Sequence, residues 1–451
     1  MTTPTQTPVH SPGRSARRAW LAVAGAVVLV VASMLFPVIT GEDVRVHAPP
    51  LHADWGPDVG FHTLLPLAVG VGLLLAWRYV VERLAWPWFL AASYAMAWLW
   101  PFSLAISLGR AGFARLYERP GEYLHDAVRV QDVGVMMHEF VERIPYTHPD
   151  NWHVHVAGHP PGALLFYIGL DRIGIDDPFW VGVVVMTLGA TGVLAGTLCV
   201  RVLAGERWAR RVAPWLVLAP LAIWMSQGDA LFMAVAAWGL ALLAVAATRA
   251  STRSRAAWGV AAGLVLGLCV FLSYGLVLLG ILALAVLWLT RRWSVLPFAL
   301  AGALVVTAAF TVAGFSWWEA YPVLVERYNA GIASERSYHY WVWANLAAWT
   351  FSVGLVTWAA LPEAFAALRR REPVAVLAVA GFVTILLATL SGMSKAEVER
   401  IWMPFSLFVL MACAYLPSRW RMPALATNVL LGLAIQTLYI IPVLALARSP
   451  Q

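Results

Sequence analysis

Long, uninterrupted runs of apolar residues recur along this chain and limit its possible folds more than any other feature. Many reach the roughly 20 residues that an α-helix needs to cross a bilayer. Only 12% of the 451 residues are charged, about half the share found in soluble domains. In lipid, only helices or closed barrels satisfy the backbone, and runs without apolar–polar alternation indicate helices. The sequence therefore predicts an all-α, polytopic transmembrane helical bundle.

We expect about thirteen membrane spans (range 11–14), because neighbouring short runs can be merged or divided. The expected spans cover residues 19–40, 61–81, 88–108, 178–200, 211–227, 229–247, 257–273, 274–290, 294–315, 341–363, 373–393, 401–417 and 424–447. The segment 160–174 is short and carries Asp171 and Arg172, so we expect it to be re-entrant or interfacial.

The domain organisation follows from these spans. We expect a disordered cytoplasmic tail over 1–18 and a single transmembrane domain over 19–447. That domain includes a long extracytoplasmic loop over 109–160, and a short tail over 448–451 follows it.

Basic residues cluster in the turns between apolar runs, as the positive-inside rule requires. Arg14, Arg17 and Arg18 place the N-terminus in the cytoplasm, and acidic loops such as 42–60 and 394–400 then fall outside. This distribution accounts for the net charge of +7 without nucleic acid as a partner. We predict a multi-pass plasma-membrane protein with an extracytoplasmic active site. The 24 Trp residues suit belts at the membrane interfaces.

The interval 118–162 is the longest polar stretch of the chain and is rich in histidine. Apolar residues recur within it at helical spacing, which predicts an amphipathic helix on the membrane surface. These residues are Val130, Val133, Met137, Phe140 or Val141, and Ile144. Prolines end helical structure beyond them.

Two carboxylates in this interval are candidates for catalysis. If 122–143 is helical, Glu122 and Asp126 lie on one face, where either can act as a general base towards a sugar hydroxyl. The alternatives are a solvated first helical turn favoured by the helix dipole, and an ion pair between Asp126 and Arg129. The sequence leaves these readings open.

His159 opens the His-Pro-Pro-Gly sequence that ends the loop. The two prolines fix an extended backbone and Gly162 permits close approach, so His159 is held where the next helix begins. The alternative is an ordinary helix start with proline in its first turn. His153, His155 and His159 also have a spacing found among metal ligands. No acidic or cysteine ligand stands at a fixed spacing, so the residues specify no cofactor, and a divalent metal is the alternative.

Further charged residues stand at the ends of apolar runs. Asp229 lies where one run ends outside and the next begins, which makes it a functional candidate or a helix N-cap. Arg327, Arg336 and Tyr338 share a polar loop. Arginine with tyrosine there can bind a lipid phosphate or anchor the chain at the interface.

Two more pairs complete the candidate site. Glu397 and Arg400 precede another apolar run and can serve a lipid phosphate or form a structural ion pair. Asp43 and Asp54 belong to the acidic loop between the first two spans. That loop can line the same cavity or only cap it.

Four segments together resemble the GT-C superfamily of membrane glycosyltransferases, which includes protein mannosyltransferases and bacterial lipid A aminoarabinose transferases. GEYLHDA at 121–127 looks like the acidic start of their first large external loop, and HPPG at 159–162 is similar to the turn that closes it. GDALFMAVAAWG at 228–239 resembles their helix-mouth Asp. KAEVERIWMPF at 395–405 resembles a Gly-Glu-x-x-Arg-x-Trp segment, with Ala396 in place of the glycine.

The resemblance implies an inverting sugar transfer that is metal-independent or weakly metal-dependent. The donor would be a polyprenyl-phosphate-linked sugar, and the acceptor a glycan, lipid or protein outside the cytoplasm. Membrane lipid and an apolar groove would hold the prenyl chain. The resemblance also implies that Glu122 or Asp126 is the base, that Asp229 shapes a substrate pocket, and that Arg336 or Arg400 holds the lipid phosphate.

This sequence departs from the family in one respect. In the family the acidic loop follows the first span directly, whereas here two further spans come first. Asp43 or Asp54 is therefore an alternative counterpart of the catalytic acid.

Three other functions compete with sugar transfer. A transporter or flippase of a lipid-linked or small polar substrate predicts internal repeats and broken helices at the midplane. A membrane metalloenzyme predicts zinc on the loop histidines. An acyltransferase predicts His159 as the base on a lipid-linked donor.

Overall fold

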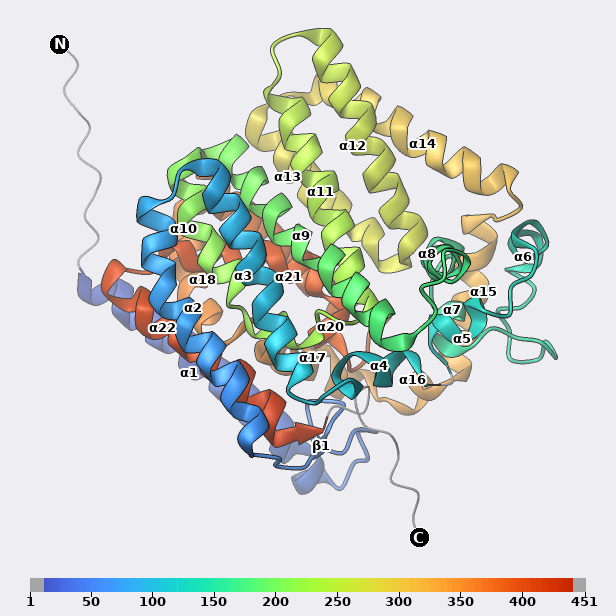
Figure 1. The fold of residues 1–451 in the computed structure, drawn as a ribbon, viewed down its shortest axis with the longest axis horizontal. Coiled ribbons are helices and arrows are strands. Elements are labelled where there is room, and N and C mark those ends of the chain that lie inside the picture. Colours follow the sequence, from blue (N-terminus) through green and yellow to red (C-terminus); the bar gives the residue numbers. More distant parts are fainter. Residues whose placement is uncertain (1–11, 120, 441–451) are drawn as a thin grey trace.

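The computed structural model of the protein describes residues 12–119 and 121–440. The start of the expected tail 1–18, the end of the expected span 424–447 and the whole expected tail 448–451 lie outside these residues. The described chain is mostly helical (Figure 1).

Eight described helices are long and apolar enough to cross a membrane. They are α1 (Pro12–Thr40), α2 (Leu64–Arg83), α3 (Trp86–Ile106), α9 (Pro178–Ala204), α11 (Gly228–Thr248), α12 (Thr252–Leu272), α14 (Leu296–Val312) and α19 (Pro373–Leu390). Short 3-10 turns precede two of them, η1 (Phe61–Thr63) before α2 and η4 (Trp293–Val295) before α14. The predicted polytopic helical membrane bundle is confirmed.

Four of the other five expected spans form shorter or broken helices. They comprise α10 (Glu206–Val217) with η2 (Pro220–Trp224), η3 (Tyr274–Leu278) with α13 (Leu279–Thr290), α17 (Tyr338–Val353) with α18 (Leu355–Leu368), and α20 (Val398–Ile401) with α21 (Met403–Val409) and η5 (Leu410–Tyr415). The fifth, α22 (Ser418–Leu438), is a continuous helix of 21 residues but is not among the eight apolar helices. The α17–α18 pair bends by 102° at Gly354, whose φ of +77° favours glycine. With that pair as one span, the described residues offer up to nine, and the count of thirteen stays a prediction.

Short helices gather at one end of the bundle, towards the lower right of Figure 1. They are α4 (Ala111–Tyr117), α5 (Tyr123–Ala127), α6 (Val133–Glu139), α7 (Val154–Ala157), α8 (Pro161–Arg172), α15 (Trp317–Ala330) and α16 (Ile332–Glu335). The twelve residues of α8 extend about 18 Å, too short to cross a core of roughly 30 Å. This agrees with the expectation for 160–174.

The expectation of one continuous amphipathic helix over 122–143 is wrong. The structure divides it into α5 and α6, because Asp132 accepts from the backbone N–H groups of Gly134 and Val135 and thereby starts a new helix. The apolar positions face protein instead of lipid: Met137, Phe140 and Ile144 are buried.

Two short strands join the first external loop to the end of the last helix. β1 (Asp54–Trp55) pairs antiparallel with β2 (Tyr439–Ile440), with Asp54 opposite Ile440 and Trp55 opposite Tyr439. This pairing brings the loop 41–60 to the same end of the bundle as α4 and α5 (Figure 1).

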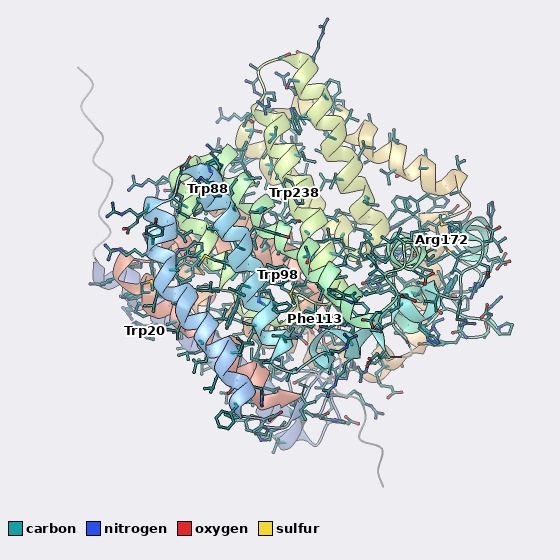
Figure 2. All side chains as sticks on the ribbon, viewed as in Figure 1. Trp20, Trp88, Trp98, Phe113, Arg172 and Trp238 are labelled. Carbon is teal, nitrogen blue, oxygen red and sulfur yellow. The ribbon has the colours of Figure 1, made fainter. Side chains whose placement is uncertain are left out.

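The tryptophans divide between the surface and the core. Trp20 and Trp88 lie at the edge of the bundle (Figure 2), with 66% and 70% of their surface exposed, as an interfacial belt requires. Others are fully buried, namely Trp100, Trp152, Trp215, Trp224, Trp341, Trp349 and Trp402.

Small residues set the position of α11, the helix that starts at the candidate site. A Cβ on Gly189 of α9 would lie 2.8 Å from the Cβ of Ala230 on α11, so the two helices approach closely. On its other side α11 packs against α12. Its first residues are therefore held by the centre of the bundle.

Candidate active site

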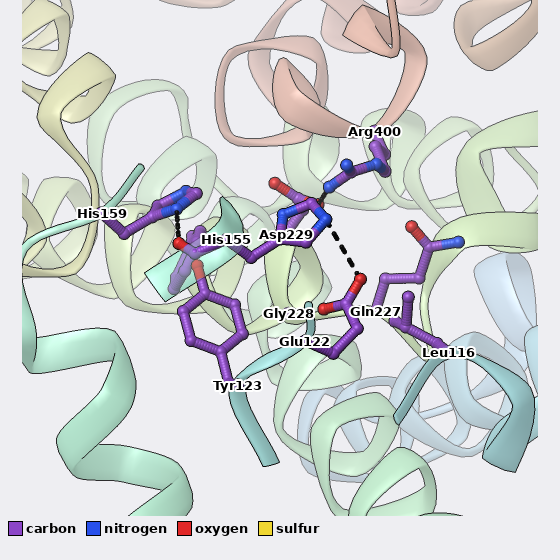
Figure 3. Close-up of a pocket in the computed structure, with 10 residues that line it drawn as sticks. Leu116, Glu122, Tyr123, His155, His159, Gln227, Gly228, Asp229 and Arg400 are labelled. Carbon is purple, nitrogen blue, oxygen red and sulfur yellow. Dashed lines mark hydrogen bonds and ion pairs between the residues drawn. The ribbon is translucent and has the colours of Figure 1, made fainter. Parts of the chain in front are cut away.

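One pocket at the loop end of the bundle brings together five of the predicted site residues, Glu122, His155, His159, Asp229 and Arg400 (Figure 3). Its lining comes from segments far apart in the chain: Leu116, Glu122, Tyr123, His155, His159, Gln227, Gly228, Asp229, Phe232 and Arg400. Its free volume is about 10 Å³, room for roughly one water molecule.

Glu122 is the buried carboxyl group of the pocket. It precedes α5 with an extended backbone, and 7% of its surface is exposed. Its Oε1 lies 3.2 Å from Nε2 of His155. Burial raises the pKa of Glu122 to about 8; Arg400 opposes the shift, and the charge of Asp229 adds to it. Once ionised, a carboxylate with such a pKa is a stronger proton acceptor than an ordinary glutamate.

The two pocket histidines are held neutral. Burial, together with the charge of Arg400, lowers the pKa of His155 to about 4. Burial also lowers the pKa of His159, whose Nδ1 donates to the carbonyl of His155 at 2.8 Å. The His159 ring lies against Phe232 and Tyr123, with ring centroids 5.5 and 5.7 Å apart. The double-proline turn thus delivers His159 to the pocket, as its position before the helix predicts.

Arg400 joins two carboxylates at the pocket wall. Its Nη1 donates to Oδ2 of Asp229 at 2.7 Å. Its Nε donates to Oε2 of Glu397 at 3.2 Å, and Nη2 makes a second contact with the same oxygen. The other oxygen of Glu397 lies 3.1 Å from Nδ1 of His52. Burial disfavours the charge of Arg400, but Glu397 and Asp229 outweigh burial and raise its pKa well above the ordinary value.

The N-cap alternative for Asp229 is wrong. Helix α11 begins at Gly228 with Gln227 as its N-cap residue, and Asp229 lies in the first turn. Its carboxylate is directed to Arg400 instead of the backbone. Figure 3 shows Asp229 beside the end of the Arg400 side chain.

The backbone that presents Glu397 is strained. Ala396 and Glu397 both have positive φ, 68° and 58°, a conformation that non-glycine residues rarely adopt. Asn345 holds this turn by accepting from the N–H of Ala396 at 3.2 Å. Arg336 donates to the carbonyl of Lys395 at 2.8 Å, so Arg336 supports the turn and does not line the pocket. A glycine at position 396 would relieve the strain there.

The structure separates Asp126 from Glu122. Asp126 is 1% exposed and lies outside the pocket lining. Its carboxylate accepts from the backbone N–H of His153 at 3.1 Å and lies 2.7 Å from Nδ1 of the same residue. Arg129 approaches to 3.7 Å and also bonds to Asp150 at 2.9 Å. Asp126 therefore fastens one loop segment to another.

Arg327 and Tyr338 also make structural contacts. Arg327 is 7% exposed and donates to the carbonyl of Trp152 at 2.7 Å, and it contacts the carbonyl of Ile144 as well. Tyr338 donates to the carbonyl of Leu390 at 2.9 Å. Neither side chain lines the pocket.

The acids of the first loop lie apart from the pocket. The Asp43 carboxylate accepts from the backbone N–H of Arg45 at 2.9 Å and is largely exposed. Asp54 lies 2.6 Å from Nδ1 of His47 at the surface. His52 is the residue that connects this loop to the site, through Glu397.

The three loop histidines have different partners. His153 bonds to Asp126, His155 lies beside Glu122, and His159 bonds to a backbone carbonyl. Within 12–119 and 121–440, no three His, Cys, Asp or Glu side chains converge so that they could hold a metal ion. The residues present therefore do not fit a divalent metal at this spacing.

An apolar groove of about 350 Å³ lies elsewhere, between α1, α18 and α22. Trp20, Leu355 and Trp420 are among its lining residues, and none of its residues lines the pocket. The structure thus separates this groove from the polar site.

Sequence reasoning missed two polar residues of the pocket, Gln227 and Tyr123. Gln227 is uncharged and gives no signal except its place two residues before Asp229. Tyr123 adjoins Glu122 and stacks on Tyr167 with centroids 4.9 Å apart. Its position beside a candidate acid was the available signal.

No family model matches the sequence, and no curated protein gives a significant match. Among solved structures, the chain is similar to the Archaeoglobus fulgidus oligosaccharyltransferase in complex with Zn and sulfate. The TM-score is 0.51 and the identity 14%, over 77% of this chain and 53% of that chain. ArnT from Cupriavidus metallidurans bound to undecaprenyl phosphate gives a TM-score of 0.47 and 18% identity, over 75% of this chain and 62% of that chain.

The chain therefore spans 53–62% of the length of these solved structures. At such low identity the likeness concerns the fold alone. For the fold, the predicted resemblance is confirmed by the likeness to the oligosaccharyltransferase.

Proposed function

We propose that this protein is a membrane glycosyltransferase that moves a sugar from a polyprenyl-phosphate donor to a hydroxyl group of a glycan, lipid or protein acceptor. The reaction takes place at the loop end of the bundle, on the extracytoplasmic side. The observation that most supports this proposal is the pocket itself. It combines a buried carboxyl group of raised pKa, Glu122, with a guanidinium group, Arg400, and two neutral histidines.

The reaction is a single displacement at the anomeric carbon. The acceptor hydroxyl gives its proton to Glu122 while its oxygen forms the new bond to that carbon. The bond from the carbon to the phosphate oxygen breaks, and the lipid phosphate leaves with the electron pair. Attack and departure on opposite faces invert the configuration. His155, 3.2 Å from Glu122, holds the carboxyl group in position to accept the proton.

Arg400 is the group best placed to stabilise the leaving phosphate. A guanidinium has five N–H donors, and Asp229 and Glu397 engage three of them in the described structure. The remaining donors can bind phosphate oxygens as charge develops on them. Asp229 and Glu397 keep the guanidinium fixed, so little reorganisation accompanies the reaction.

Substrate binding requires the pocket to open, because a free volume of about 10 Å³ does not admit a sugar ring. We expect α5 and α7 to move and α11 to stay in place. The first two have only five and four residues, whereas α11 has 21 and packs between α9 and α12. This movement would carry Glu122 towards the acceptor.

The test is transfer by the purified protein in lipid nanodiscs. A panel of polyprenyl-phosphate sugars is offered, and both transfer and hydrolysis are measured, with and without a chelator to establish metal dependence. We expect turnover of at least one donor, and a loss of about 10²–10⁴-fold in Glu122→Gln. Asp54→Asn is the matched control and retains activity. Absence of turnover with every donor, or a fully active Glu122→Gln, would contradict the proposal.

The alternative function is transport or flipping of a lipid-linked or small polar substrate. Its one supporting observation is the broken helix pair α17–α18, bent by 102°. A Cβ on Gly354 at this break would lie 2.6 Å from Oδ1 of Asn428, and neither residue lines the polar pocket. The break is therefore packed by protein, and the polar groups converge elsewhere.

A further inference from the structure

Gln227 is a buried amide with no protein partner in the pocket wall. Its exposed fraction is 1%, and neither Oε1 nor Nε2 has a hydrogen-bond partner among the described residues. The hydroxyl of Tyr123, 4% exposed and in the same lining, also lacks a partner there. Figure 3 shows the Gln227 carboxamide between Leu116 and Arg400.

Such an arrangement destabilises the folded protein. Buried polar groups are nearly always hydrogen-bonded, and an unpaired buried donor or acceptor loses its hydration without compensation. An apolar side chain of similar size would avoid this loss. A glutamine at this position therefore indicates a polar ligand that satisfies both ends of the amide.

The geometry of an amide group restricts what that ligand can be. Its oxygen accepts and its nitrogen donates, side by side in one plane. Two adjacent hydroxyl groups on a sugar ring match this pair, because one hydroxyl donates to Oε1 while the next accepts from Nε2. A lone phosphate offers only acceptors and would leave Oε1 unpaired.

The position of Gln227 in the chain favours the donor sugar, and not the acceptor, as the ligand of its amide. Gln227 stands two residues before Asp229, whose carboxylate holds Arg400 at 2.7 Å. In the proposed reaction Arg400 binds the phosphate to which the donor sugar is attached. The hydroxyl groups of that sugar are thus the polar groups that remain closest to Gln227.

We propose that Gln227 recognises a vicinal diol of the donor sugar, and that it thereby selects which polyprenyl-phosphate sugar is transferred. This inference rests on the proposed glycosyltransferase function and makes it more specific. The substrate class is a donor sugar with two neighbouring free hydroxyl groups. Gln227 is a specificity-determining residue and takes no part in proton transfer.

The experiment compares donors that differ by one hydroxyl group. For the sugar that the wild-type protein transfers, each single deoxy analogue on polyprenyl phosphate is assayed, and kcat/KM is measured for wild type and Gln227→Leu. We expect wild type to reject one or two adjacent deoxy analogues by at least roughly 100-fold, since a site built to bind a hydroxyl discriminates strongly. The selectivity ratio is kcat/KM for the parent donor divided by kcat/KM for the deoxy analogue. In Gln227→Leu this ratio should fall towards about 1, because kcat/KM drops for the parent donor but not for the analogue.

Gln436→Leu is the matched control. Gln436 is also a buried glutamine, 9% exposed, but its amide donates to the carbonyl of Leu104 and does not line the pocket. It should lower the melting temperature and leave the selectivity ratio unchanged. Gln227→Glu, which keeps the acceptor and loses the donor, should give an intermediate ratio.

The two proposals fail in different ways. Wild-type protein that transfers no sugar overturns the glycosyltransferase function, and the role of Gln227 with it. Active wild-type protein whose deoxy selectivity survives in Gln227→Leu overturns the role of Gln227 alone. That second result would show that solvent, and not the sugar, satisfies the amide.

Discussion

The Arg400 guanidinium donates to the Asp229 carboxylate at 2.7 Å, although the two residues stand 171 positions apart in the chain. The ion pair joins the first turn of α11 to the short helix α20, and both side chains are almost fully buried. It therefore fixes one wall of the pocket. Charge, burial and long sequence separation meet in this contact, which makes it the first to test.

Asp229→Asn should damage both folding and activity. Removing one partner of a buried ion pair costs about 3–5 kcal/mol, because Arg400 keeps its charge beside Glu397 only. We expect a lower melting temperature and strongly reduced transfer, measured by thermal unfolding and by the donor assay. Glu82→Gln breaks the exposed pair with Arg78 and should change stability by less than about 1 kcal/mol. Equal losses in the two variants would contradict a special role for the buried pair.

The variant Asp126→Asn tests whether the Asp126 carboxylate is structural or catalytic. Asp126 binds His153 through two contacts and lies outside the pocket, so its loss should loosen the segment 121–159 without removing the base. We expect faster proteolysis of this loop and a lower melting temperature. At low temperature, kcat should stay within about tenfold of wild type. A loss of kcat as large as that in Glu122→Gln would instead make Asp126 the base.

The raised pKa of Glu122 predicts opposite pH trends for activity and stability. The free enzyme needs the ionised carboxylate, so kcat/KM should rise with pH, reach half of its maximum near pH 8 and level off above that value. The folded state holds the proton up to about pH 8, whereas the unfolded chain releases it near the ordinary value of 4.5. Stability should therefore fall as pH rises between these values.

Glu122→Gln is the control for both trends. It should remove the pH-dependent rise in any residual transfer and reduce the decline in stability. Glu399 also has its pKa raised to about 8 by burial, so part of the decline should remain. Thermal unfolding across pH 4.5–8 in both proteins checks the second trend. An unchanged slope in the variant would mean that Glu122 ionises normally in the folded state.

The sequence reveals much of the fold and part of the site because charges are rare in an apolar chain. Asp229, Glu397 and Arg400 are conspicuous at the ends of apolar runs, and the structure brings them together. Glu122 and Asp126 could not be distinguished, because their relation depends on where α5 begins. Glu122 is the extended N-cap residue of α5, whereas Asp126 lies inside the helix.

Other features left no trace in the sequence pattern. In the sequence, Arg327 and Arg336 look like residues that bind phosphate. In the structure, their guanidinium groups donate to backbone carbonyl groups in turns that are distant in the sequence. Gln227 carries no charge that would single it out. The bend at Gly354 depends on the positive φ angle of that residue. The apolar run that predicts one span therefore forms two helices, α17 and α18. Each of these depends on tertiary contacts that composition and periodicity do not encode.

Gly162→Ala tests how the double-proline turn delivers His159 to the pocket. A Cβ at position 162 would lie 2.4 Å from the carbonyl oxygen of Phe271 on α12. Because backbone cannot rotate away as a side chain can, α8 must shift from α12. We expect a loss of about 1–3 kcal/mol in stability. His159, three residues earlier, should move with α8, and transfer should fall by roughly 10²-fold, as a displacement of 1 Å can cause.

Gly169→Ala is the matched control on the same helix. A Cβ there meets no atom within 4 Å, and alanine favours helix by up to about 1 kcal/mol over glycine. This variant should be as stable as wild type or more so, with normal transfer. If Gly162→Ala were equally stable and active, the contact between α8 and α12 would not position His159. The histidine would then have to be held by its own bond to the carbonyl of His155.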